Sequence, residues 1–123
     1  LSTRFENKNI LLLKKIKNSL NINFIKEKVS EYKEIDIKIF KDIPGFKLFP
    51  HEDAPHHKAF LMFNLTNNID STMFYDAEKK FLCKGPNKKN KGVFHILRTK
   101  PPILHAIENT SNKNRYTAIA FIK

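Results

Sequence analysis

The chain has 123 residues, of which 41% are hydrophobic, with eleven Phe and no Trp. This length and composition are those of one globular domain with its own core, and they exclude a disordered chain. Cys83 is the only cysteine, which excludes a disulfide framework and favours a reducing, cytoplasmic location. No apolar run approaches the roughly 18–20 residues that cross a bilayer, so no membrane partner is expected. The sequence begins at Leu1 rather than Met and leaves open whether residues precede it.

The net charge of +11 raises the question of nucleic-acid binding. Most of the basic residues are Lys scattered along the chain, and the densest cluster, residues 84–92, is typical of a solvated loop. Only Arg4, Arg98 and Arg115 are arginines, and Arg is the residue best suited to forked phosphate recognition. Nucleic acid is therefore an unfavoured partner.

The first third of the chain has helical periodicity. Apolar residues at three- and four-residue intervals predict a helix over Asn9–Leu20. A second helix is predicted over Phe24–Lys33, with Asn23 as its N-cap. Neither segment carries clustered polar groups on one face, so both are expected to pack against a sheet.

From Ile35 onward the apolar period changes to two, as in half-buried strands. Pro44-Gly45 gives the first turn signal. About seven short strands separated by Pro, Gly and Asn turns predict an antiparallel barrel or sandwich. After the strand at Ile35, the predicted strands are Phe46–Asp53, Ala59–Thr66, Thr72–Asp76, Val93–Arg98, Ile103–Glu108 and Tyr116–Ile122.

Four residues of the second half form a candidate site: His51, Asp53, His105 and Arg115. Residues i and i+2 of a strand project to one face, so His51 and Asp53 are expected to point together into the barrel mouth. Two imidazoles and a carboxylate suit Fe(II) with positions left open. Taken singly, His105 is also compatible with a packed core histidine and Arg115 with a surface charge. The occurrence of all four residues in this order favours a metal-binding site over these separate interpretations.

These residues carry a resemblance to a known family. His51-Glu52-Asp53, His105, and Arg115 ten residues later resemble the 2-oxoglutarate- and Fe(II)-dependent oxygenases, with the prolyl-hydroxylase-like branch favoured. The segments Gly45–Pro55, Ala59–Leu65 and Ser71–Tyr75 are similar to the family's first core strands. The resemblance covers roughly residues 35–123.

The resemblance implies a mainly β fold with a double-stranded β-helix (jelly-roll, cupin-like) core and one or two buttressing N-terminal helices. Residues 1–123 would form a single oxygenase domain, with helical support in 1–34 and the core in 35–123. With few residues between strands, the chain is typical of a minimal core or a fragment.

The resemblance also implies site residues and cofactors. His51, Asp53 and His105 would bind Fe(II), and Arg115 would bind the C5 carboxylate of the cosubstrate 2-oxoglutarate, assisted by Thr117. O2 would be the second cosubstrate, and ascorbate is a potential support. Lesser candidates for cosubstrate or substrate contact are Tyr75, Asn64 and His56. For His56 and its neighbour His57 a solvated loop is the favoured interpretation, and for His95 a packed histidine.

The implied function is oxidative decarboxylation of 2-oxoglutarate to succinate, coupled to hydroxylation of a protein prolyl residue, another side chain or a small molecule. A nucleic-acid dealkylase fits poorly, because that subgroup has a second Arg at the position of Phe121. Two alternatives stay open: a non-catalytic jelly-roll binding module, and a cupin-like metalloprotein that uses no 2-oxoglutarate and has no need for Arg115. The primary substrate and the oligomeric state are left open.

Overall fold

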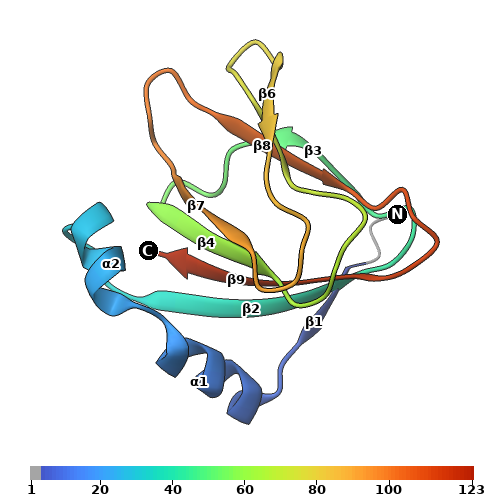
Figure 1. Ribbon diagram of the computed structural model, residues 1–123. Helices are drawn as coiled ribbons and strands as arrows, with labels where there is room; N and C mark the ends of the chain where they lie inside the picture. The colour runs from blue at the N-terminus through green and yellow to red at the C-terminus, as the bar shows by residue number, and fades with distance from the viewer. Residues whose placement is uncertain (1–3) are drawn as a thin grey trace.

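The computed structural model describes residues 4–123, which form two antiparallel β-sheets and two helices (Figure 1). The five-stranded sheet has the order β1 (Arg4–Asn7), β2 (Ile35–Asp42), β9 (Arg115–Ile122), β4 (Ala59–Asn64) and β7 (Gly92–Ile96). The four-stranded sheet has the order β3 (Lys47–His51), β8 (Leu104–Glu108), β5 (Met73–Tyr75) and β6 (Phe81–Lys84). The predicted double-stranded β-helix is confirmed.

The three central strands of the five-stranded sheet, β2, β9 and β4, are largely buried, which is why they are rich in apolar residues. One face packs against α1 (Ile10–Ser19) and α2 (Ile22–Lys28). In Figure 1, α1 lies beneath β2 and α2 lies beside the end where β2 begins. The shared core cluster of this layer consists of Ile25, Ile35, Ile37, Ala59, Ala120 and Ile122. The predicted packing of the helices against a sheet is therefore confirmed. Neither helix within residues 4–123 has the length and apolar character needed to cross a membrane.

The other face of this sheet meets the four-stranded sheet across a second core cluster. Alternate residues of β2, β4 and β9 point to it, as the two-residue period requires. The cluster consists of Phe40, Phe60, Met62, Phe74, Leu97 and Ile119. Polar residues interrupt this layer at its edges, and there the candidate site lies.

The helix bounds differ in part from the prediction. The first helix, α1, begins at Ile10 rather than Asn9, because Asn9 is its N-cap and its side chain accepts from the backbone N–H of Leu12 at 3.0 Å. The second helix begins earlier, because Asn21 rather than Asn23 is its cap and accepts from the N–H of Phe24 at 3.0 Å. It ends at Lys28, five residues before the predicted end.

Three differences concern strands. β1 and β6 are not among the predicted strands, because neither segment shows an alternation of apolar and polar residues. β3 ends at His51, so Asp53 lies in the following loop rather than on the strand. This last difference changes how the site is assembled.

Candidate metal centre and interior cavity

His51, Asp53 and His105 come together as predicted. One potential ligand atom from each lies within 4.8 Å of the others. Oδ1 of Asp53 is 3.1 Å from Nε2 of His105 and 3.5 Å from Nε2 of His51. No other group of three or more His, Cys, Asp or Glu side chains gathers in this way within residues 4–123.

The pairing of β3 with β8 places the two histidines. His51 lies opposite His105 and Leu48 opposite Ile107, so three steps along β3 match two along β8. This irregularity is a β-bulge, which inserts one residue and reverses the alternation beyond it. Leu48 and His51 consequently both line the interior cavity, although strict alternation would send residues three apart to opposite faces.

Arg98 holds the loop that carries Asp53. Its Nη2 donates to the backbone carbonyls of Asp53 and Ala54, and its Nε donates to that of His57 at 3.2 Å. Its Nη1 pairs with the Glu52 carboxylate at 3.0 Å. The backbone of Arg98 has a φ of 63°, in the left-handed region that non-glycine residues rarely adopt. The predicted two-residue strand geometry for Asp53 is therefore wrong, and a loop clamped by Arg98 takes its place.

The electrostatics of the trio favour a charged carboxylate. Burial by itself would raise the pKa of Asp53, but hydrogen bonds with His105 and His51 outweigh it and hold that pKa far below its ordinary value. The same hydrogen bond to Asp53 is the largest cause that raises the pKa of His51. Nδ1 of His51 donates to the carbonyl of Phe49 at 2.7 Å, since a carbonyl can only accept. In neutral His51 this leaves the Nε2 lone pair free for a metal.

The residues present fit a metal ion of the implied kind. Oδ2 of Asp53 is buried and has no hydrogen-bond partner within the described part of the chain. Such buried orphan acceptors are uncommon in proteins unless an ion or water satisfies them. Two imidazoles and one carboxylate, with the remaining positions open, are the donor set of non-haem Fe(II) sites.

His57 lies closer to this centre than predicted. Its Nδ1 is 3.7 Å from Oδ2 of Asp53, and its ring packs on Phe121 with centroids 4.9 Å apart. Burial lowers the pKa of His57. The interpretation of His57 as part of a solvated loop is therefore wrong, whereas His56 is exposed as expected, its ring against that of His57. His95 is a packed histidine, as predicted, between the rings of Phe60 and Phe74.

Arg115 is buried on the inner face of β9 but already has partners within the protein. Nη1 donates to Oδ2 of Asp42 at 3.2 Å, and Nη2 donates to Oγ1 of Thr72 at 3.1 Å. Nε donates to the carbonyl of Asp70 at 3.3 Å. Burial lowers the pKa of Arg115, and the carboxylate of Asp42 opposes that shift.

Thr117 follows two residues along β9 and is fully buried. Its Oγ1 has no hydrogen-bond partner within residues 4–123. The hydroxyl predicted to assist Arg115 is thus an unsatisfied polar group close in sequence to that residue, and a bound polar ligand could satisfy it.

Asn64 and Tyr75, two lesser candidates, lie away from the trio. Asn64 donates to the carbonyls of Pro86 and Lys91 at 2.9 and 3.0 Å and so holds the loop between β6 and β7. Tyr75 lies on the outer face of the four-stranded sheet, because its neighbour Phe74 points inward.

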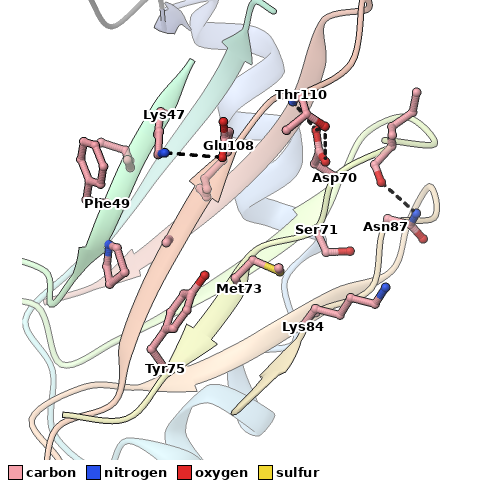
Figure 2. A pocket seen from close by; sticks show the side chains of 16 residues that line it. Lys47, Phe49, Asp70, Ser71, Met73, Tyr75, Lys84, Asn87, Glu108 and Thr110 are labelled. Atoms are coloured by element: carbon pink, nitrogen blue, oxygen red, sulfur yellow. Dashed lines mark hydrogen bonds and ion pairs between the residues drawn. The ribbon is translucent and has the colours of Figure 1, made fainter. Parts of the chain in front are cut away.

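The outer face carries a hollow of about 450 Å³, which Figure 2 shows. Phe49, Met73 and Tyr75 line it, and Lys47 pairs with Glu108 across it at 3.7 Å. The trio faces the other side of this sheet, toward the second core cluster. The hollow is therefore separate from the metal centre.

The cavity beside the trio is smaller, about 50 Å³, and lies between the two sheets. This is room for one or two water molecules, at about 30 Å³ each. His51, Asp53 and His105 line it, together with Arg4, Thr72 and apolar residues of β4 and β9. No local sequence pattern connects Arg4, Asp42, Thr72 or Arg98 to the trio, so their place around it is visible only in the structure.

No protein-family model matches the chain, and no curated protein matches its sequence. Solved structures do match. The collagen prolyl hydroxylase of Paramecium bursaria Chlorella virus-1, in its 2OG complex, aligns with a TM-score of 0.65 at 16% identity, over 98% of this chain and 78% of that one. A Pseudomonas putida prolyl-4-hydroxylase aligns with a TM-score of 0.69 at 7% identity, over 99% and 71%. A cupin-superfamily sugar phosphate isomerase from Silicibacter pomeroyi gives 0.51 at 10%, over 74% and 52%.

At these identities the likeness concerns the fold. It agrees with the sheet order, the two helices and the predicted resemblance. The chain has the fold of these two prolyl hydroxylases.

Proposed function

We propose that the protein is a 2-oxoglutarate- and Fe(II)-dependent dioxygenase that hydroxylates an aliphatic position, in a protein or peptide side chain such as a prolyl residue or in a small molecule. His51, Asp53 and His105 hold the metal. Bound there, Fe(II) supplies the redox chemistry that couples decarboxylation of 2-oxoglutarate to hydroxylation. Arg115 and Thr117, on the inner face of β9, stabilise the distal carboxylate of the cosubstrate with a positive charge and a hydroxyl group.

The observation that carries this proposal is the convergence of the trio within 4.8 Å beside an interior cavity. Phe60, Ile119 and Phe121 line that cavity, and their apolar side chains limit the access of water to it. The fold likeness to two prolyl hydroxylases supports the proposal.

The metal assignment is tested by anaerobic titration of the metal-free protein with Fe(II). His51→Ala and Asp53→Ala each leave two ligands, too few to hold a labile divalent ion, so both variants should lose measurable binding while remaining folded. His56→Ala is the matched control, because His56 is an exposed histidine of the same loop. Wild-type affinity in either ligand variant would show that the trio does not bind the metal.

A second candidate function is a cupin-like metalloprotein that uses no 2-oxoglutarate. It is favoured by Asp42, whose carboxylate already pairs with Arg115 at 3.2 Å. The two functions differ in one measurement. Adding 2-oxoglutarate to the Fe(II)-loaded protein without oxygen should produce a weak visible charge-transfer band if the cosubstrate chelates the metal. Absence of the band, with the metal bound, favours the cupin-like alternative.

A further inference from the structure

Arg4, Asp42 and Arg115 form a row across three adjacent strands. In the antiparallel register Arg4 lies opposite Asp42, and Asp42 lies opposite Arg115. Directly paired residues of neighbouring strands point to the same face of a sheet. The row therefore lies on the inner face of the five-stranded sheet, although its outer members are far apart in the sequence.

Asp42 is fully buried between the two guanidinium groups. Arg4 forms a bidentate pair with its carboxylate: Nε donates to Oδ1 at 2.6 Å and Nη2 donates to Oδ2 at 2.9 Å. Arg115 adds one hydrogen bond to Oδ2. The guanidinium of Arg4 also lies 4.1 Å from the ring centroid of Phe40 and 4.6 Å from that of Phe46, so its position is set by stacking as well as by charge.

The row carries one surplus positive charge, because two guanidinium groups face a single carboxylate. Arg115 with Asp42 alone would form a neutral pair, and a second carboxylate approaching it would meet the charge of Asp42. Arg4 restores the net attraction. The Asp70 carboxylate is engaged elsewhere, by the backbone N–H and hydroxyl of Thr110.

Arg4 is also the basic residue that borders the interior cavity. It lines the cavity with Thr72 and the metal-binding trio, whereas Arg115 lies behind Thr72 and is not part of the lining. Within residues 4–123 the Nη1 of Arg4 has no hydrogen-bond partner. Arg4 is 18% exposed and sits on β1, an edge strand. The cavity is too small for an organic acid, so binding of such a ligand requires the cavity to open at this edge of the sheet.

We propose that Arg4 binds the distal carboxylate of a 2-oxo dicarboxylate in the interior cavity, with Arg115 as the buried charge behind it. The proposal rests on the proposed function and adds a second arginine, from the N-terminal strand, to the cosubstrate site. It also names the ligand class. The cavity should prefer an acid with a carboxylate at each end over one with a single carboxylate.

The test compares two ligands of the Fe(II)-loaded protein without oxygen: 2-oxoglutarate, and 2-oxovalerate, which has a methyl group in place of the distal carboxylate. Arg4→Gln should weaken 2-oxoglutarate about ten- to a hundred-fold, the range for a lost charge-assisted hydrogen bond. It should change 2-oxovalerate affinity less than about two-fold, because that ligand has no group for Arg4. Arg4→Lys should give an intermediate loss, since an ammonium keeps the charge without the fork.

Glu6→Gln is the matched control, because Glu6 lies on the same strand and forms an ion pair with Lys38 at 3.9 Å, away from Asp42. It should leave both affinities unchanged. Equal 2-oxoglutarate affinity in wild type and Arg4→Gln, or equal losses for both ligands, would overturn the role of Arg4. A wild-type protein that binds Fe(II) but neither ligand would overturn the proposed function itself. If Arg4→Gln does not fold, Arg4→Lys decides, because it keeps the charge without the fork. An unchanged 2-oxoglutarate affinity in that variant, or equal losses for both ligands, would then overturn the role of Arg4.

Discussion

All three arginines of this chain contact residues that line the interior cavity or lie next to it. Arg4 and Arg115 share the carboxylate of Asp42, and Arg98 clamps the loop that carries Asp53. The planar guanidinium group has five donors in a fixed fork and stays charged when buried. A single Arg can therefore satisfy several acceptors at once, which an ammonium group cannot do in the same geometry.

The contacts of Arg98 predict that it positions a metal ligand without touching the metal. Arg98→Ala should lower Fe(II) affinity by about ten-fold or more, the usual effect of losing a supporting residue behind a ligand. Arg98→Lys should recover part of the loss, because it can keep the ion pair with Glu52 but not the three carbonyl contacts. Anaerobic titration of the metal-free variants measures this.

Lys100→Ala serves as control for that experiment, because Lys100 is an exposed basic residue two positions further along the same loop. It should bind Fe(II) as the wild type does. If Arg98→Ala also binds with unchanged affinity, the loop holds Asp53 in place without the clamp.

At the scale of elements, the five-stranded sheet depends on a close approach between β4 and β7. A Cβ added to Gly92 would lie 2.1 Å from the carbonyl oxygen of Met62 and 2.8 Å from Cβ of Phe63. No side chain fits there unless the backbone moves. Gly92 is thus required by packing, whereas a Cβ at Gly85 would make ordinary contacts at 3.6 Å and beyond.

Gly92→Ala should therefore destabilise the protein by about 1–3 kcal/mol or more, the range for overpacked sites. Gly85→Ala, in the loop between β6 and β7, should stay within roughly 1 kcal/mol of wild type, because its added methyl group meets no close contact. Urea unfolding of both variants measures the difference. Equal stabilities would mean that β7 can move away from β4 at little cost.

The buried residue of α2 is Ile25. Ile25 is 0% exposed and belongs to the cluster that joins the helices to the sheet. Ile25→Ala should cost about 2–5 kcal/mol, because it removes buried methyl groups and leaves a cavity. Leu11→Ala on α1 should cost less than about 0.5 kcal/mol, since Leu11 is 80% exposed. Thermal or urea unfolding checks both values, and similar losses would contradict the observed burial.

At the scale of the whole molecule, a buried histidine links stability to pH. Burial, with the nearby His105 as a second cause, lowers the pKa of His95 below its ordinary 6.5. The unfolded chain therefore takes up a proton near pH 6.5 that the folded protein resists. His95 thus makes the free energy of unfolding fall as the pH drops through 6.5, and rise as the pH increases.

His95→Gln should flatten this dependence in the metal-free protein. Glutamine is neutral throughout, so the loss of stability between pH 7.5 and pH 5 should be smaller in the variant than in wild type. The slope against pH, rather than the absolute stability, is the readout. His51 acts in the opposite direction: its raised pKa gives stability that is present below pH 6.5 and is lost as the pH rises through the folded-state value. A variant slope equal to that of wild type would contradict the prediction.

The sequence by itself determined the strands of the core, the helical support and the chemical identity of the trio. The two-residue alternation from Ile35 to Ile39 and the apolar run that ends at Ile122 are local patterns, which depend only on neighbouring residues. His51, Asp53 and His105 could be recognised as candidate metal ligands from their residue types and their order along the chain.

Only the tertiary structure decided how that trio and its surroundings are built. Asp53 reaches His51 through a loop held by Arg98, which lies 45 residues further along the chain. Asp42 and Arg115 are 73 residues apart and meet through the register of β2 and β9, which also brings β1 and Arg4 into the same row. Strand register and bulges depend on contacts across the whole sheet, so they cannot be predicted from local periodicity.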